Sequence, residues 1–137
     1  MGKIQVGVYN SKKVQITLAT LVVTGFNSKK VSIKAVTKKK WESEAGVDGD
    51  VTRSLNHDER YELEFELKSE SPSNAAIRAL SASELSFPVL VKNTSGGAYI
   101  GGGVDGWVSE RPERDFESKS KPIVWKIEVA AYDEADL

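Results

Sequence analysis

The sequence contains no cysteine and only one histidine, His57. The absence of cysteine excludes disulfide scaffolds, zinc sites with cysteine ligands, iron–sulfur clusters and thiol catalysis. A single histidine also removes most of the remaining metal chemistry, because imidazole is the commonest metal ligand. We therefore expect no metal and no cofactor.

The sequence also lacks an excess of charge of one sign and a long hydrophobic run. Its 19 Lys and Arg residues nearly balance 20 Asp and Glu residues, which gives a formal charge of −1. Duplex-binding proteins use a basic excess to displace counterions, so tight binding along DNA is not expected. The apolar stretch at residues 18–23 is far shorter than the roughly 20 residues of a membrane span. No signal-peptide pattern opens the sequence, and we expect no membrane contact.

The main pattern that is present is an alternation of apolar and polar residues with period two, which predicts a mainly β protein. The 137 residues are 39% hydrophobic, enough for one core, and we expect a single domain over residues 1–137. Residues 14–26 and 31–35 are expected to form a long hairpin that turns at Asn27 and Ser28. The strands are expected at residues 3–9, 14–26, 31–35, 60–68, 87–92, 98–108 and 123–129.

Three segments depart from this pattern. Ser71 is a good N-cap and Pro72 suits the first helical turn, so one helix is expected to follow and to pack on the sheet. Residues 37–50 show no regular alternation and are expected to form a long loop of the kind that often carries function. The acidic residues 131–137 are expected to fray.

Several motifs suggest enzymes but lack the necessary context. Residues 101–106 match the glycine spacing of a nucleotide loop, yet proline follows where the helix would begin. Ser54, His57 and Asp58 are the residue types of a hydrolytic triad, but near neighbours in sequence rarely reach its geometry. The residues 48–50 (Asp-Gly-Asp) lack the other ligands of a calcium loop. We expect a protein that is not an enzyme.

Two groups of residues remain as candidate sites. Lys38, Lys39 and Lys40 precede Trp41, a combination that fits contact with an anion or nucleic acid, or an aromatic anchor for a protein partner. Glu62, Glu64 and Glu66 share one face of the best-patterned strand. That face is either simply solvated or a surface that repels something negative, because a catalytic carboxylate pair would need an asymmetry that is not visible here.

The order of these features resembles that of a known family. A hairpin and a long loop are followed by Val47-Asp48-Gly49-Asp50-Val51-Thr52-Arg53-Ser54-Leu55, a strand, then Ser69-Glu70-Ser71-Pro72-Ser73-Asn74-Ala75 and a short helix. This order resembles the tail tube proteins of tailed bacteriophages, especially contractile-tailed phages, which are related in fold to pyocin and type VI secretion tubes. The resemblance extends over about residues 14–129.

The resemblance implies a β-sandwich or small barrel with one flanking helix. It also implies a structural virion protein of the phage tail, synthesised in the host cytoplasm, with hexameric rings stacked into a tube for DNA ejection. Its partners would be further copies, the tail sheath, and baseplate or terminator proteins, with genomic DNA passing without specific binding. The alternatives are another tail protein, such as a tube terminator or connector, and a β-sandwich binding or adhesion module.

The resemblance assigns residues to these contacts. The loop at residues 37–50 would contact neighbouring subunits and stacked rings, with Trp41 as the anchor. Glu62, Glu64 and Glu66 would face either the lumen or the sheath. The residues assigned to the subunit and ring-stacking contact are Lys38, Lys39, Lys40, Trp41, Glu42, Asp48 and Asp50.

Overall fold

The structure, a computed structural model, describes residues 14–94, 97–114, 116 and 121–137. These residues form ten strands and one helix. The strand expected at residues 3–9 lies outside the described residues. The elements in chain order are β2 (Val14–Leu18), β3 (Leu21–Val22), β4 (Phe26–Ala35), β5 (Trp41–Ala45), β6 (Val51–Leu55), β7 (Tyr61–Leu67), α1 (Ser73–Ala82), β8 (Phe87–Asn93), β9 (Tyr99–Glu110), β10 (Ile123–Val129) and β11 (Asp133–Asp136).

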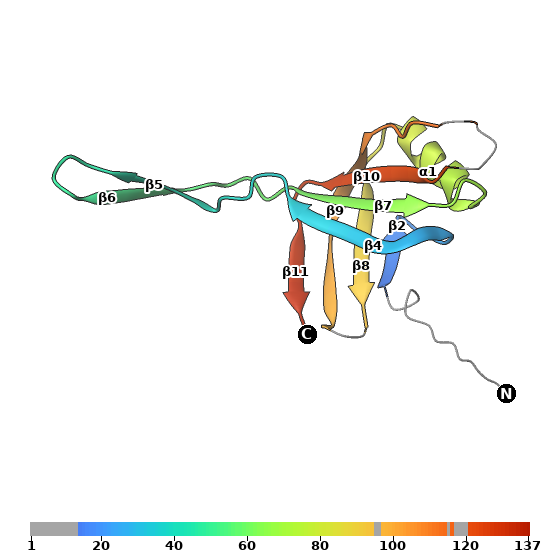
Figure 1. The fold of residues 1–137 in the computed structure, drawn as a ribbon, viewed down its shortest axis with the longest axis horizontal. Helices are drawn as coiled ribbons and strands as arrows, with labels where there is room; N and C mark the ends of the chain where they lie inside the picture. Colours follow the sequence, from blue (N-terminus) through green and yellow to red (C-terminus); the bar gives the residue numbers. More distant parts are fainter. Residues whose placement is uncertain (1–13, 95–96, 115, 117–120) are drawn as a thin grey trace.

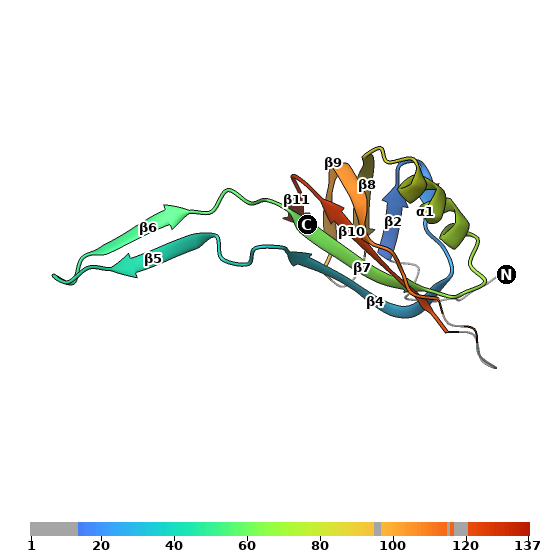
Figure 2. The same cartoon turned by 90° about the horizontal axis from the view of Figure 1, so that it is seen from above.

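Eight strands form one antiparallel sheet in the order β3-β2-β8-β9-β10-β7-β4, and β11 pairs with β9 beside this path. The sheet curls into a half-barrel, with α1 near one end (Figures 1 and 2). The mainly β fold with one flanking helix is therefore confirmed, and the eight described strands form one curled half-barrel sheet.

The alternation in β7 and β10 builds the centre of the core. Register pairs Trp125 of β10 with Phe65 of β7, and Ile127 with Leu63, so large apolar side chains stack across the two strands. All four are buried, as is Ile77 of α1. The helix is also tied to the core by a hydrogen bond that the Trp125 indole donates to Asn74 (Nε1 to Oδ1, 2.9 Å).

A two-stranded hairpin, β5 and β6, extends away from the sheet at the end opposite α1 (Figures 1 and 2). We call residues 36–60 the arm. The expectation of an irregular loop at residues 37–50 was wrong, because β5 pairs regularly with β6 from Trp41 opposite Leu55 to Ala45 opposite Val51. All ten strand residues of the arm are exposed, so no apolar alternation marked them as strands.

The long hairpin expected over residues 14–35 is also absent. β2 pairs with β3 and β8, whereas β4 pairs with β7. The chain turns away after β2 at Ala19, whose φ is 58°, and again at Gly25, whose φ is 78°. The expected turn at Asn27 lies inside β4, where the register with β7 shifts between Phe26 and Val31.

The acidic carboxyl end does not fray as expected but forms β11, paired with β9 from Asp133 opposite Gly102 to Asp136 opposite Tyr99. Contacts of Tyr132 explain why this carboxyl-terminal segment is ordered. Its ring stacks on Tyr61 with 4.6 Å between centroids, and its hydroxyl lies 2.6 Å from that of Tyr99. Two aromatic contacts thus hold the residue that precedes β11.

The helix begins close to where the sequence predicts it. Pro72 is the N-cap and Ser73 the first helical residue. The Ser71 hydroxyl accepts a hydrogen bond from the Ser73 amide at 3.2 Å and donates one to the Thr24 carbonyl at 2.7 Å. Ser71 therefore caps the helix from one position earlier and also joins it to the segment before β4.

Candidate assembly surfaces

The arm has two chemically different faces. One face of the arm carries Trp41, Ala45, Val51, Arg53 and Leu55. Side chains two residues apart on a strand point to the same face, and the register places Trp41 opposite Leu55 and Ala45 opposite Val51. The Arg53 guanidinium stacks over the Trp41 ring at 4.3 Å, which confirms that the two side chains lie together. The opposite face carries Glu42 and Glu44, paired with Ser54 and Thr52.

The apolar face of the arm is open to solvent. Trp41 is 42% exposed and Val51 70%. An isolated two-stranded hairpin is marginally stable in water, so the arm needs another surface to be well ordered. The residues predicted to make contacts lie on different parts of the arm. Trp41 lies on the apolar face, Glu42 on the acidic face, and Asp48 and Asp50 in the connection between β5 and β6 at the tip.

The base of the arm is held by the carboxylate of Asp58. It accepts two hydrogen bonds from the Arg60 guanidinium, both at 2.8 Å, and one from the Thr37 hydroxyl at 2.7 Å. The bonds from Arg60, and then that from Thr37, hold the pKa of Asp58 well below its usual range. This cluster joins the outgoing and returning chains of the arm, beside the exposed Lys38, Lys39 and Lys40.

The three glutamates of β7 lie on the sheet face opposite the core. The Lys34 ammonium is 3.5 Å from Glu62, and Lys126 lies opposite Glu64 in the register with β10. Glu128 is opposite Glu62 and accepts a hydrogen bond from the Trp107 indole at 3.2 Å. We call this surface the polar face; its charged members are Lys34, Arg60, Glu62, Glu64, Glu66, Lys126 and Glu128, with the Arg60 guanidinium 3.4 Å from the Glu128 carboxylate.

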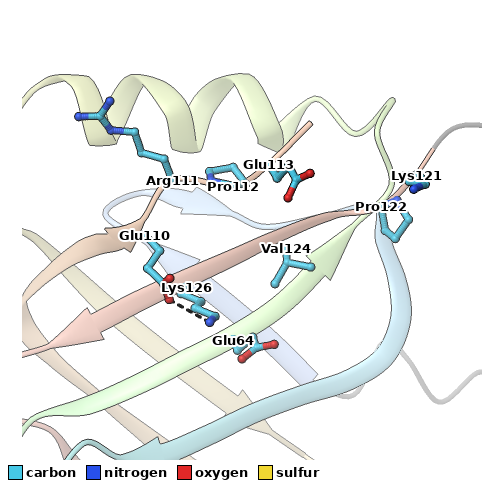
Figure 3. Close-up of a pocket in the computed structure, with 9 residues that line it drawn as sticks. All are labelled: Glu64, Glu110, Arg111, Pro112, Glu113, Lys121, Pro122, Val124 and Lys126. Atoms are coloured by element: carbon cyan, nitrogen blue, oxygen red, sulfur yellow. Dashed lines mark ion pairs between the residues drawn. The ribbon is translucent and has the colours of Figure 1, made fainter. Parts of the chain in front are cut away.

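The polar face ends in a hollow of about 450 Å³ (Figure 3). Lys126 lies between two acids here, because it is opposite Glu64 on one side and Glu110 on the other. Its ammonium forms an ion pair with Glu110 at 2.9 Å, and this hydrogen bond raises the pKa of Lys126. Lys126 therefore separates the carboxylates of Glu64 and Glu110 across the three strands.

The motifs that suggested enzymes do not form sites in the described residues. Asp58 is engaged by Arg60 and Thr37, and no hydrogen bond there joins it to His57 or Ser54. The glycine motif at residues 101–106 lies within β9 rather than before a helix. No cluster of metal-binding residues occurs in the part of the chain that the structure describes. Likewise, no helix there is long and apolar enough to cross a membrane.

β4 lies at one edge of the described sheet. Among the described residues, this ten-residue strand pairs only with β7. Such an edge is a template for pairing with another chain.

No protein-family model matches the sequence, and no curated protein does. Solved structures do match it over nearly its whole length. The tube-terminating cap of the anti-feeding prophage is 9% identical with a TM-score of 0.60, covering 99% of this chain and 97% of that one. The chain has the tail-tube fold.

Two further structures support this conclusion. The sheath/tube terminator of an extracellular contractile injection system (PVC) is 10% identical with a TM-score of 0.58, covering 97% of this chain and 98% of that one. Hcp1 from Flavobacterium johnsoniae is 13% identical with a TM-score of 0.51, covering 90% of this chain and 97% of that one. At these identities the likeness concerns the fold, which confirms the resemblance seen in the sequence.

Within the tail-tube fold, one surface was not foreseen from the sequence. Gly102 and its neighbours in β9 form the floor of a groove of about 610 Å³ between β8 and β11. A Cβ on Gly102 would overlap the carbonyl oxygen of Val89, so only glycine fits there. The sequence signal was the glycine run itself, but its partner strand β11 was not predicted.

Proposed function

We propose that this chain is a structural subunit of the tail tube of a bacteriophage or a related contractile injection system. In this proposal, hexameric rings stack into a hollow tube through which DNA passes. The observation that carries it is the arm, an exposed hairpin with one apolar face, on a chain with the tail-tube fold over its whole described length. A hairpin of this kind gains order and buries apolar surface only by contact with another molecule.

The edge position of β4 in the described sheet supports the same proposal. Joining the sheet edges of neighbouring subunits into one barrel would pair backbone groups across the subunit boundary and leave no exposed edge. Edge pairing would thus build the ring, while the arm would reach between subunits or between rings. The sheath and the baseplate proteins are the further partners expected of such a tube.

The polar face is our candidate for a lumen wall. Four carboxylates from β7 and β10 lie there with Lys34, Lys126 and the Arg60 guanidinium, which is 3.4 Å from Glu128, so these groups carry no basic excess. A DNA channel should not bind its cargo, and a wall without a basic excess does not hold a polyanion. The alternative orientation places the same face outward, toward the sheath.

A tube terminator is the second candidate function. It is favoured by the likeness to two capping proteins, the anti-feeding prophage cap and the PVC terminator. The two functions differ in assembly, because a terminator stops at one ring whereas a tube protein continues to add rings.

Native mass spectrometry over a range of protein concentrations tests both functions. Masses that grow by whole rings with concentration would support the tube, and a single ring mass at all concentrations would support the terminator. A monomer mass at every concentration would contradict both.

A further inference from the structure

The glycine-floored groove beside β11 has the chemistry to receive the arm of another subunit. Its apolar wall consists of Leu90, Ile100, Val104 and Ala135, on the face away from the core. Leu90 is 43% exposed and Val104 76%, so the described part of the chain leaves them uncovered. Gly102 lies opposite Leu90 in the register, and the close Val89 backbone leaves no room for a side chain there, so the floor of the groove is bare backbone.

Asp133 of β11 places one carboxylate at the rim of the groove, and no ion pair engages it within the described ranges. Glu134 follows it on the strand, but its carboxylate accepts a hydrogen bond from the hydroxyl of the core-packed Tyr99 at 3.4 Å. The apolar face of the arm is complementary to this groove. Val51 and Leu55 would pack against the apolar wall, and the Arg53 guanidinium would pair with the carboxylate at the rim. Arg53 likewise has no carboxylate partner in the described residues.

From this match we infer that the arm of one subunit docks its apolar face in the glycine-floored groove of a second copy of this chain. The inference rests on the proposed function, since it names the receptor for the assembly arm. The arm and the groove are different surfaces, so each copy docks its arm in one neighbour and accepts the arm of another neighbour in its groove. Such head-to-tail contacts either close into rings or continue as filaments. The competing contact of arm with arm would join two apolar faces that each carry the cationic Arg53 and would supply no carboxylate from either face.

Cysteine cross-linking tests the contact cleanly, because the natural chain contains no cysteine. The test pair is Val51→Cys in the arm with Val104→Cys in the groove, both at exposed positions. The matched control is Thr52→Cys with Val104→Cys, since Thr52 lies next along the strand but on the opposite face. Assembled protein is oxidised and separated on a denaturing, non-reducing gel.

We expect the test pair to give a ladder of linked chains and the control pair to remain monomeric on the gel. A second pair, Leu55→Cys with Leu90→Cys, covers the case in which the first pair prevents assembly. Assemblies that form without either ladder would overturn the groove as the receptor and leave the proposed function standing. Linked dimers from Val51→Cys alone would also overturn it, in favour of contact between arms. A chain that stays monomeric at every concentration would overturn the proposed function together with this inference.

Discussion

At the scale of single residues, Gly102 sets the shape of the groove. A Cβ there would overlap the Val89 carbonyl oxygen on the neighbouring strand, and this backbone cannot move without breaking the pairing of β8 with β9. We predict that Gly102→Ala lowers the free energy of unfolding by about 2–4 kcal/mol. Urea denaturation measures this change.

Gly46→Ala is the matched control, because a Cβ at Gly46 meets only an ordinary contact at 3.5 Å from the Asp50 carbonyl. It should change the unfolding free energy by no more than about 0.5 kcal/mol. Equal changes in the unfolding free energy for the two substitutions would show that the close approach of Gly102 to the Val89 carbonyl does not affect stability.

Asp58 makes the base of the arm sensitive to pH. Its pKa in the folded protein is lowered from an ordinary value of 3.8, chiefly by the Arg60 hydrogen bonds. A lowered pKa contributes stability above the ordinary value, and this contribution is lost as the pH falls toward the folded value. We predict that Asp58→Asn lowers Tm at pH 7, and that the gap from the natural protein narrows at pH 3. A gap of the same size at both pH values would contradict this role of the Asp58 charge.

At the scale of elements, our proposal has the arm act through assembly rather than through folding. We predict that Trp41→Ala raises the critical concentration for polymerisation roughly thirtyfold, equivalent to about 2 kcal/mol, because an aromatic anchor is lost. Circular dichroism should stay unchanged, since Trp41 lies outside the core. Sedimentation at a series of concentrations measures the effect.

Glu42→Ala provides the comparison for Trp41→Ala on the same strand. Glu42 lies on the acidic face of the arm, so its removal should shift the critical concentration much less. Unchanged polymer length in Trp41→Ala, with a normal spectrum, would count against the anchor.

The elements also show which parts of the fold can be predicted from sequence. β7, β10 and α1 could be predicted because one face of each is buried, so apolar residues recur at the period of the element. The strands of the arm could not, since every residue in them is exposed. β11 could not either, because its order depends on the Tyr132 contacts and on backbone pairing with β9.

The candidate sites were likewise predictable only where the pattern of residues along one strand marks them. Trp41 and the three glutamates of β7 could be identified from residue type and alternation. The groove could not, because it combines residues of β8, β9 and β11 that are distant in sequence. The long hairpin was mistaken because nothing in residue type signals the positive φ of Ala19.

At the scale of the whole molecule, the polar face bears on how DNA would move. We predict that the double variant Glu64→Gln, Glu66→Gln assembles normally but slows DNA release, because the loss of two carboxylates leaves the face with a basic excess that attracts the phosphates. The measurement is the rate of DNA ejection from particles whose tails carry the variant. Glu84→Gln removes an exposed charge after α1 and should leave the rate unchanged. Normal ejection from the double variant would mean that the polar face does not line the lumen.

The central claim is that this chain is built to assemble into a tube. Negative-stain electron microscopy of the purified protein over a range of concentrations tests it most directly. Our account predicts six-fold rings that give way to hollow tubes as the concentration rises. Single small particles at every concentration would contradict it.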